Sequence, residues 1–102
     1  MRPLSPELMA AHRVKNLLRD PRNWYHPENG RVGACLAQAI TWAVPYNNAV
    51  PWPAMKLRLA FEKYTPNGLV RWNDAPGRTH GEVMELCEKV ILDEERRWAM
   101  AA

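Results

Sequence analysis

A tryptophan and three polar side chains of different chemistry lie within seven residues of the chain. They are Trp72, Asn73, Asp74 and Arg78. An aromatic face, an amide, a carboxylate and a guanidinium at this spacing can hold a polar ligand. The same residues can instead close a turn, because an Asn or Asp side chain can accept from backbone amides two residues on and Arg78 can fold back onto Asp74 or a carbonyl. We favour the turn, which makes these residues a structural clasp first and a binding site second.

A second arrangement that could carry chemistry joins Cys35, His80 and Asp74. Cys35 stands at the start of a predicted helix, where the helix N-terminus favours the thiolate. His80 can serve as its base and Asp74 as the acid that orients the histidine, a pattern typical of hydrolases and transferases. The segment after Cys35 is wholly apolar, so we expect an inert thiol there and rank a Cys35-dependent enzyme last.

Neither a metal site nor a cofactor site has a motif in this sequence. The two cysteines and three histidines, Cys35, Cys87, His12, His26 and His80, show none of the short paired spacings of zinc sites. There is no glycine-rich phosphate loop and no serine in a nucleophile elbow. We therefore predict no metal, no cofactor and no catalytic residue, and we expect both cysteines to be reduced and buried.

Charge is unevenly distributed along the chain. The formal net charge is +3 and the isoelectric point is about 9.1. Residues 1–34 carry six basic and three acidic side chains, whereas residues 71–102 carry five basic and seven acidic ones. The basic part can complement the acidic part within the molecule or form a docking face for an acidic partner. We favour internal complementarity.

The basic N-terminal third also supports a nucleic-acid interface as an alternative. Its candidate phosphate contacts are Arg13, Lys15, Arg19 and Arg22, and Trp24, Tyr25 and His26 can stack on bases. A helix-turn-helix is disfavoured, because the predicted gaps between helices are far longer than its turn of about three or four residues.

The first and last of four predicted helices have clear boundaries. Ser5-Pro6 is typical of an N-cap followed by a proline at the first helical position, and Asp20-Pro21 ends that helix. Thr79 and Glu82 have the spacing of a capping box, so the last helix begins there and runs to about Trp98. The i, i+3, i+4 ladder of this helix consists of Val83, Leu86, Cys87, Val90, Ile91 and Glu94.

The two middle helices are separated by a proline-containing loop at residues 45–53. Residues 34–44 are apolar apart from Gln38 and Thr41, which predicts a central helix surrounded by the others. The inward-facing residues of the third helix are expected to be Met55, Leu59 or Ala60, and Phe61. It should end at Thr65-Pro66-Asn67-Gly68.

Two short extended elements complete the prediction. Asn29-Gly30 is a turn signal that can close one short hairpin near residues 24–32. Residues 69–72 are expected to be extended. The predicted fold is a single all-α domain over residues 1–102, with four helices and a central apolar second helix, since 102 residues suit one modest core. No signal-peptide pattern and no run of 18 apolar residues occurs, so we expect a cytoplasmic protein without membrane spans.

The order of these elements resembles the domain of unknown function 6197 family of bacterial and phage proteins. The similarity rests mainly on Trp72, Asn73, Asp74, Pro76, Arg78, Thr79, Glu82 and Val83. Weaker agreement covers Trp24, Gly30, Arg31 and residues 35–40, where the family commonly has a glycine and this chain has Gln38. The resemblance implies a single helical domain of bacterial or phage origin and, because the family has no established activity, implies no reaction.

These observations favour a small non-catalytic accessory protein that binds another macromolecule, first of all a protein. Its candidate binding residues are Trp72, Asn73, Asp74, Arg78, Trp24 and Arg31. A nucleic-acid binder that uses the basic N-terminal third is the main alternative, and a second copy of the chain is also an allowed partner.

Overall fold

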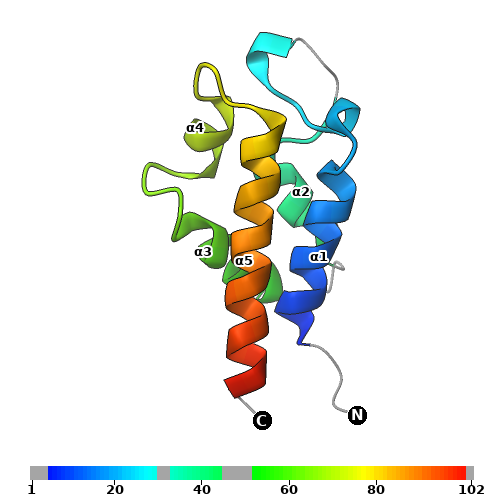
Figure 1. Ribbon diagram of the computed structural model, residues 1–102, viewed down its shortest axis with the longest axis vertical. Coiled ribbons are helices and arrows are strands. Elements are labelled where there is room, and N and C mark those ends of the chain that lie inside the picture. The colour runs from blue at the N-terminus through cyan, green and yellow to red at the C-terminus, as the bar shows by residue number, and fades with distance from the viewer. Residues whose placement is uncertain (1–4, 30–32, 45–51, 101–102) are drawn as a thin grey trace.

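Helices account for the whole regular structure of the described residues. The computed structural model describes residues 5–29, 33–44 and 52–100. Its helices are α1 (Pro6–Leu18), α2 (Leu36–Ala43), α3 (Trp52–Glu62), α4 (Leu69–Asp74) and α5 (His80–Met100), with short 3-10 helices η1 (Pro21–Asn23) and η2 (Pro27–Asn29). Figure 1 shows α1 and α5 side by side, with α4 near the start of α5 and the start of α1 toward its end. No described segment is a β-strand, so the all-α prediction is confirmed.

The first helix begins where the sequence predicts. The Ser5 hydroxyl accepts a hydrogen bond from Leu8 N at 3.1 Å, and Pro6 occupies the first turn. The buried face of α1 packs against both α5 and α2 and consists of Leu8, Ala10, Ala11, Val14 and Leu18. Leu17 lies outside this buried face and is 38% exposed.

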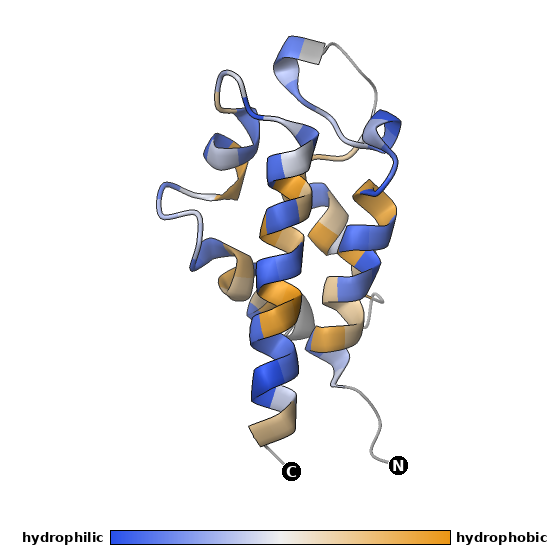
Figure 2. Cartoon of the chain, in the orientation of Figure 1, coloured by the Kyte–Doolittle hydropathy of each residue, from blue (hydrophilic) through white to orange (hydrophobic). Residues whose placement is uncertain are grey.

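The last helix also begins at its predicted cap. Thr79 N donates to Glu82 Oε1 at 2.9 Å, and Glu82 N donates to the Thr79 hydroxyl at 3.1 Å, which completes the capping box. All six members of the predicted ladder are buried, including Glu94. Hydrophilic and hydrophobic bands alternate along α5 in Figure 2, as expected for an amphipathic helix.

The second helix is less enclosed than its composition suggests. Leu36, Ala39, Ile40 and Ala43 are buried against α1, α3 and α4. Trp42, however, is 63% exposed, so the prediction of a helix surrounded on every side is wrong. The buried residues cover one side of α2, and Trp42 falls outside that arc.

The inward face of α3 also differs from the predicted one. Leu57 and Phe61 are fully buried, whereas Met55 and Leu59 are more than half exposed. Each pair is four residues apart and therefore shares a helix face. The sequence holds two competing apolar stripes, and the neighbouring helices bury the one that contains Phe61.

A fifth helix, α4, replaces the extended segment expected at residues 69–72. Gly68 takes a φ of +98°, and its carbonyl accepts the hydrogen bond from Trp72 N at 3.1 Å that closes the first turn. Leu69 and Asn73 are buried on one side of this turn. Val70 and Trp72 favour strands by propensity, but burial of the Leu69 and Asn73 face overrides that preference.

The region of the predicted hairpin takes a different form in its described part. Tyr25 N donates to Ala34 O at 3.0 Å and Ala34 N to Asn23 O at 2.8 Å, which gives an isolated parallel bridge between Trp24 and Ala34. The 3-10 helix η2 follows Trp24. Arg31 and the other residues of 30–32 lie outside the described residues, and so does that half of the hairpin.

No helix in the described part of the chain combines the length and the apolar character that crossing a membrane requires.

Candidate functional site

Asn73 forms the centre of a buried clasp. Its side chain is 0% exposed. Its Oδ1 accepts from Trp24 Nε1 at 2.7 Å and from Leu36 N at 3.2 Å. Its Nδ2 donates to Tyr25 O at 3.0 Å and to Asp74 Oδ1 at 2.9 Å. The amide thus makes the four hydrogen bonds that it can make, and it ties the Trp24 segment and the start of α2 to α4.

Arg78 closes the outer side of the same clasp. Its Nε donates to Trp72 O at 2.8 Å, its Nη1 donates to Glu82 Oε2 at 2.8 Å, and its guanidinium lies 3.9 Å from the centroid of the Trp72 ring. The sequence allowed Arg78 to fold back either onto Asp74 or onto a backbone carbonyl. The structure shows the second of these, with the Trp72 carbonyl as the acceptor. Hydrogen bonds from the Thr79 amide and hydroxyl, with Arg78 nearby, lower the pKa of Glu82.

Two histidines extend the clasp to other parts of the chain. His26 Nε2 donates to Ala75 O at 2.9 Å, and its Nδ1 accepts from Glu28 N at 3.1 Å. His80 Nε2 donates to Leu18 O at 2.6 Å, which joins the start of α5 to the end of α1. Both rings lie beside the Trp24 indole, with centroids 5.3 and 6.2 Å away. Sequence reasoning missed these roles because the Ala75 carbonyl is 49 residues from His26 and the Leu18 carbonyl is 62 residues from His80.

The predicted Cys35, His80 and Asp74 arrangement is not assembled. His80 Nε2 is used by the Leu18 carbonyl, and Asp74 Oδ1 accepts from Asn73. Among the described residues, no hydrogen bond joins His80 to either Cys35 or Asp74. The three groups therefore lack the nucleophile, base and orienting acid relationship that the enzyme hypothesis requires.

The two thiols have different surroundings. Cys87 is buried, and burial raises the pKa of its thiol to about 12. Cys35 is only partly buried, so the prediction of two buried cysteines is correct for Cys87 alone. Gln38 is exposed and accepts from Cys35 N at 3.2 Å, so the residue that stands where the resembled family commonly has glycine caps α2. No group of three metal-binding side chains occurs within the described ranges.

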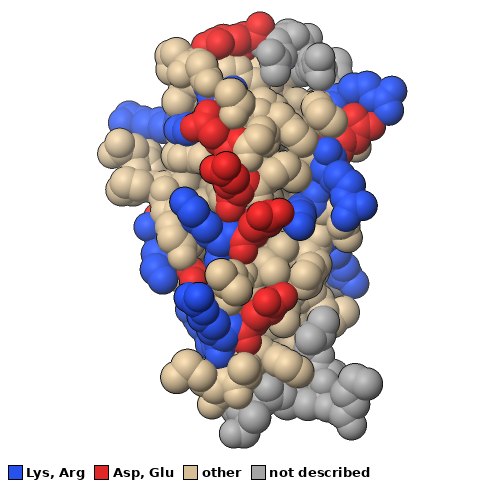
Figure 3. Space-filling model, viewed as in Figure 1, with Lys and Arg blue, Asp and Glu red and all other residues tan. Residues whose placement is uncertain are grey.

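Two of the four proposed phosphate contacts have internal partners on α2 and α5. Arg13 Nη1 donates to Ala43 O at 3.3 Å, near the end of α2. Lys15 Nζ lies 3.3 Å from Glu88 Oε1 on α5. Figure 3 shows acidic side chains along the face of α5 with basic ones on either side of them. The Lys15 pair supports the predicted internal complementarity between the first helix and the last.

The other two candidates lie toward and beyond the end of α1. Arg22 donates to both carboxylate oxygens of Asp20, the shorter contact being 2.7 Å, and this partner raises the pKa of Arg22. Arg19 is exposed. Three of the four cations thus already have an acceptor in the protein.

A hollow between α1 and α2 is lined by residues that the sequence did not connect. We define the Trp42 surface by its lining: Arg13, Asn16, Leu17, Asn23, Trp42 and Ala43. The hollow has a volume of about 380 Å³. Trp42 and Leu17 are among the exposed large apolar side chains, so this surface offers an aromatic anchor beside polar donors.

A comparison with known protein families gives one match. The model of the Family of unknown function (DUF6197) matches residues 10–93. The chain belongs to this family. No curated protein and no solved structure gives a significant match.

The DUF6197 match covers the clasp and the whole Trp42 surface. Of the sequence-predicted binding residues, the structure brings Trp24, Asn73 and Asp74 together through hydrogen bonds, and stacks Trp72 on Arg78. Arg31 is outside the described residues. The exposure of Trp42 was not predicted, because a run of apolar residues gives the same sequence pattern for a fully buried helix and for a helix with one side in solvent.

Proposed function

We propose that this DUF6197 protein is a small non-catalytic accessory protein, of a bacterium or a phage, that binds another protein through the Trp42 surface. The observation that carries the proposal is the 63% exposure of Trp42 beside a hollow. Full burial of a large apolar side chain contributes about 1.5–3 kcal/mol, and a partner that covered the exposed part of Trp42 would gain part of that free energy. Exposed aromatic anchors next to a recess are typical of the residues that dominate protein interfaces.

The polar residues around Trp42 indicate the chemistry of the partner. Arg13, Asn16 and Asn23 line the hollow beside the indole with side-chain donors, and the exposed Arg19 adds positive charge near the end of α1. A partner segment that presents an apolar side chain flanked by Asp or Glu fits this surface by both shape and charge.

Nucleic-acid binding is the second candidate, favoured by one specific observation. An exposed indole near basic side chains can act as a stacking platform for a single strand. The internal partners of Arg13, Lys15 and Arg22 weigh against it, because each of these bonds would have to compete with a phosphate contact.

The test is capture of partners from the native host on the immobilised protein, followed by mass spectrometry, with and without nuclease. A Trp42→Ala variant should lose the captured protein, and titration of the purified partner should show a loss of at least about 2 kcal/mol, the threshold of a hot spot. Leu92→Ala is the matched control, because Leu92 is an exposed apolar residue on α5.

Three results would contradict the proposal. Capture that nuclease abolishes would argue against a protein partner, capture that Trp42→Ala leaves unchanged would argue against the Trp42 surface, and a partner whose acidic residues contribute nothing to binding would argue against the proposed charge match. The first of them would favour the nucleic-acid alternative, and a log-log salt slope near the number of phosphate contacts would establish it.

The proposal includes a cytoplasmic location. Cys35 and Cys87 are both free thiols, and unpaired cysteines are usual in a reducing compartment. A second copy of the chain remains an allowed partner, which the molar mass of the purified protein in solution would test.

A further inference from the structure

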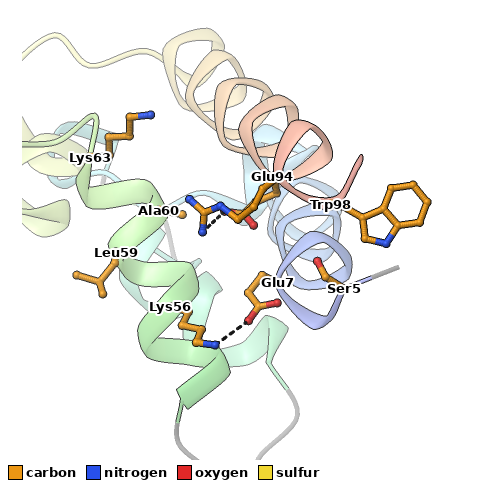
Figure 4. Close-up of a pocket in the computed structure, with 9 residues that line it drawn as sticks. Ser5, Glu7, Lys56, Leu59, Ala60, Lys63, Glu94 and Trp98 are labelled. Carbon is orange, nitrogen blue, oxygen red and sulfur yellow. Dashed lines mark ion pairs between the residues drawn. The ribbon is translucent and has the colours of Figure 1, made fainter. Parts of the chain in front are cut away.

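A groove opens between α1, α3 and α5, toward the end of α5 that is distant from the clasp. We call it the Glu94 groove, and its charged lining consists of Glu7, Lys56, Lys63, Glu94 and Arg97. Its volume is about 490 Å³. Figure 4 shows Glu7, Lys56 and Glu94 directed into the space between the three helices.

Glu94 is an unusual residue to find at the bottom of this groove. It is 3% exposed, yet its carboxylate accepts no hydrogen bond from any described residue. The nearest cation is Arg97 Nη1, at 3.6 Å from Glu94 Oε1. A buried carboxylate is costly unless it is both paired and hydrogen-bonded, so this group retains capacity for a donor.

The second carboxylate of the groove has the same kind of incomplete pairing. Glu7 Oε1 lies 3.8 Å from Lys56 Nζ, which is too far for a hydrogen bond. Glu7 is the more enclosed member of its pair, as Glu94 is of its own: the side chains of Lys56 and Arg97 are 62% and 74% exposed. The acids are therefore deep and the cations lie at the rim.

We propose that the Glu94 groove binds a ligand that carries an alkylammonium or alkylguanidinium group. The cationic head would donate to the carboxylates of Glu94 and Glu7 in charge-assisted hydrogen bonds of about 2.7–2.9 Å. Its apolar stem would lie along the α3 wall at Ala60. Lys56 and Arg97 would turn outward, since their own side chains are mostly exposed and their present contacts with Glu7 and Glu94 are longer than hydrogen bonds.

An anion is a poorer fit to the same groove. The side chains of Lys56, Lys63 and Arg97 are 62%, 66% and 74% exposed, whereas the enclosed groups of the groove are the acids Glu7 and Glu94. An anion would have to bind beside two carboxylates in a partly dehydrated space, where like charges repel strongly. Because the acids lie deep in the groove and the basic side chains lie at its rim, the groove favours a cationic ligand over an anionic one.

Two sources can supply this chemistry, a free amine or guanidine and a lysine or arginine side chain of a peptide. The probes are n-butylguanidinium and n-butylammonium, with n-butanol and butyrate as neutral and anionic controls of similar length. Binding to the isotope-labelled full chain is followed by the shifts of amide and indole resonances. We expect saturable binding of both cations and of neither control.

The deciding variant is Glu94→Gln, which keeps the side-chain volume and removes the charge. It should weaken n-butylguanidinium binding by about tenfold, and Glu7→Gln should also weaken it. Glu85→Gln, an equal change at an exposed position of α5, should bind like the wild type. Circular dichroism confirms that each variant is folded.

The proposal is overturned if neither cation binds, if butyrate binds as well as the cations, or if Glu94→Gln binds the cations as tightly as the wild type. Arginine blocked at both ends then identifies the source. Retained affinity assigns the site to a peptide side chain, lost affinity assigns it to a free base, and either result supports a cation site. These outcomes are independent of Trp42→Ala, so the groove and the proposed protein interface can fail separately.

Discussion

Buried polar side chains near the two ends of α5 differ in how completely they are hydrogen-bonded. Near its start, Asn73 makes four hydrogen bonds between 2.7 and 3.2 Å, and His80 ties the helix to the Leu18 carbonyl. Near its end, Glu94 is 3% exposed, against 0% for Asn73, and its nearest cation is 3.6 Å away. Figure 1 shows the two regions separated by most of the length of the helix.

The difference teaches how to tell a structural polar cluster from a binding one. A fully satisfied network rigidifies the fold and has no donor or acceptor left for a ligand. A buried charge without hydrogen bonds weakens the fold and leaves binding capacity. By this accounting the Asn73 clasp is structural, and the Glu94 groove is the better place to look for a small ligand.

The largest effect should come from the centre of the clasp. Asn73→Ala would leave Trp24 Nε1, Leu36 N and Tyr25 O without their buried partner. Each unsatisfied group costs about 1–3 kcal/mol, so the free energy of unfolding should fall by at least about 3 kcal/mol. Urea denaturation followed by tryptophan fluorescence measures it, with Asn67→Ala on the exposed loop before α4 as the control. A loss below about 1 kcal/mol would break the contrast between the two regions.

The outer part of the clasp should contribute less. Arg78→Ala removes two hydrogen bonds and the stack on Trp72, which should lower the free energy of unfolding by about 1–3 kcal/mol. Asp74→Ala removes one acceptor and should cost about 1 kcal/mol. If either variant stayed within about 0.5 kcal/mol of the wild type but lost its partner, the turn would be a binding site after all.

Local signals predicted the two long helices because their caps are made by near neighbours. The Ser5 cap of α1 reaches three residues, and so does the box of Thr79 and Glu82. The clasp was predicted only in part. Arg78 folding back onto a carbonyl spans six residues, whereas the contacts of Asn73 with Trp24 and Leu36 span 49 and 37.

What the sequence could not predict depends on which faces the neighbours cover. Leu57 and Leu59 have the same chemistry, and only the packing of α3 decides that the first is buried. Trp42 lies in an apolar run that fits a buried helix equally well. Residues 69–72 have a local preference for strand that burial of Leu69 and Asn73 overrides.

Glu94 shows the same limit at the groove. Its place in the ladder of α5 predicted burial correctly, but nothing local shows whether a buried carboxylate will find a donor. That depends on Arg97 and on the α1 and α3 side chains opposite, which the fold alone brings together.

A smaller effect tests the boundary between the clasp and α5. Thr79→Ala removes the hydroxyl that accepts from Glu82 N and should lower the free energy of unfolding by about 1 kcal/mol. Thr41→Ala is a suitable control, because Thr41 is exposed on α2 and its hydroxyl donates only to Ala37 O. Thermal unfolding of both variants compares them directly. Equal losses in the two would mean that the capping box adds nothing specific.

The smallest expected effect is the pH dependence of stability that Glu94 causes. It is also the most direct test of the difference between the clasp and the Glu94 groove. Burial raises the pKa of Glu94, while Arg97 opposes and Glu7 and Asp93 add to the shift; Lys56 and Lys63 also face the groove. The folded state therefore holds this proton more tightly than the unfolded state, whose glutamate pKa is about 4.3. The stabilisation that comes from protonating Glu94 in the folded state is therefore fully present below about pH 4.3, and it is lost as the pH rises through the pKa of Glu94 in the folded state.

Glu94→Gln removes this pH-dependent contribution to the free energy of unfolding. The variant should be more stable than the wild type at neutral pH, because it buries no charge, and its advantage should shrink as the pH falls toward the unfolded value. Urea unfolding of both proteins at several pH values measures the difference, and Glu85→Gln should show no such trend. A wild type that is the more stable protein at neutral pH would mean that Arg97 already satisfies Glu94. The contrast between the satisfied clasp and the open groove would then disappear.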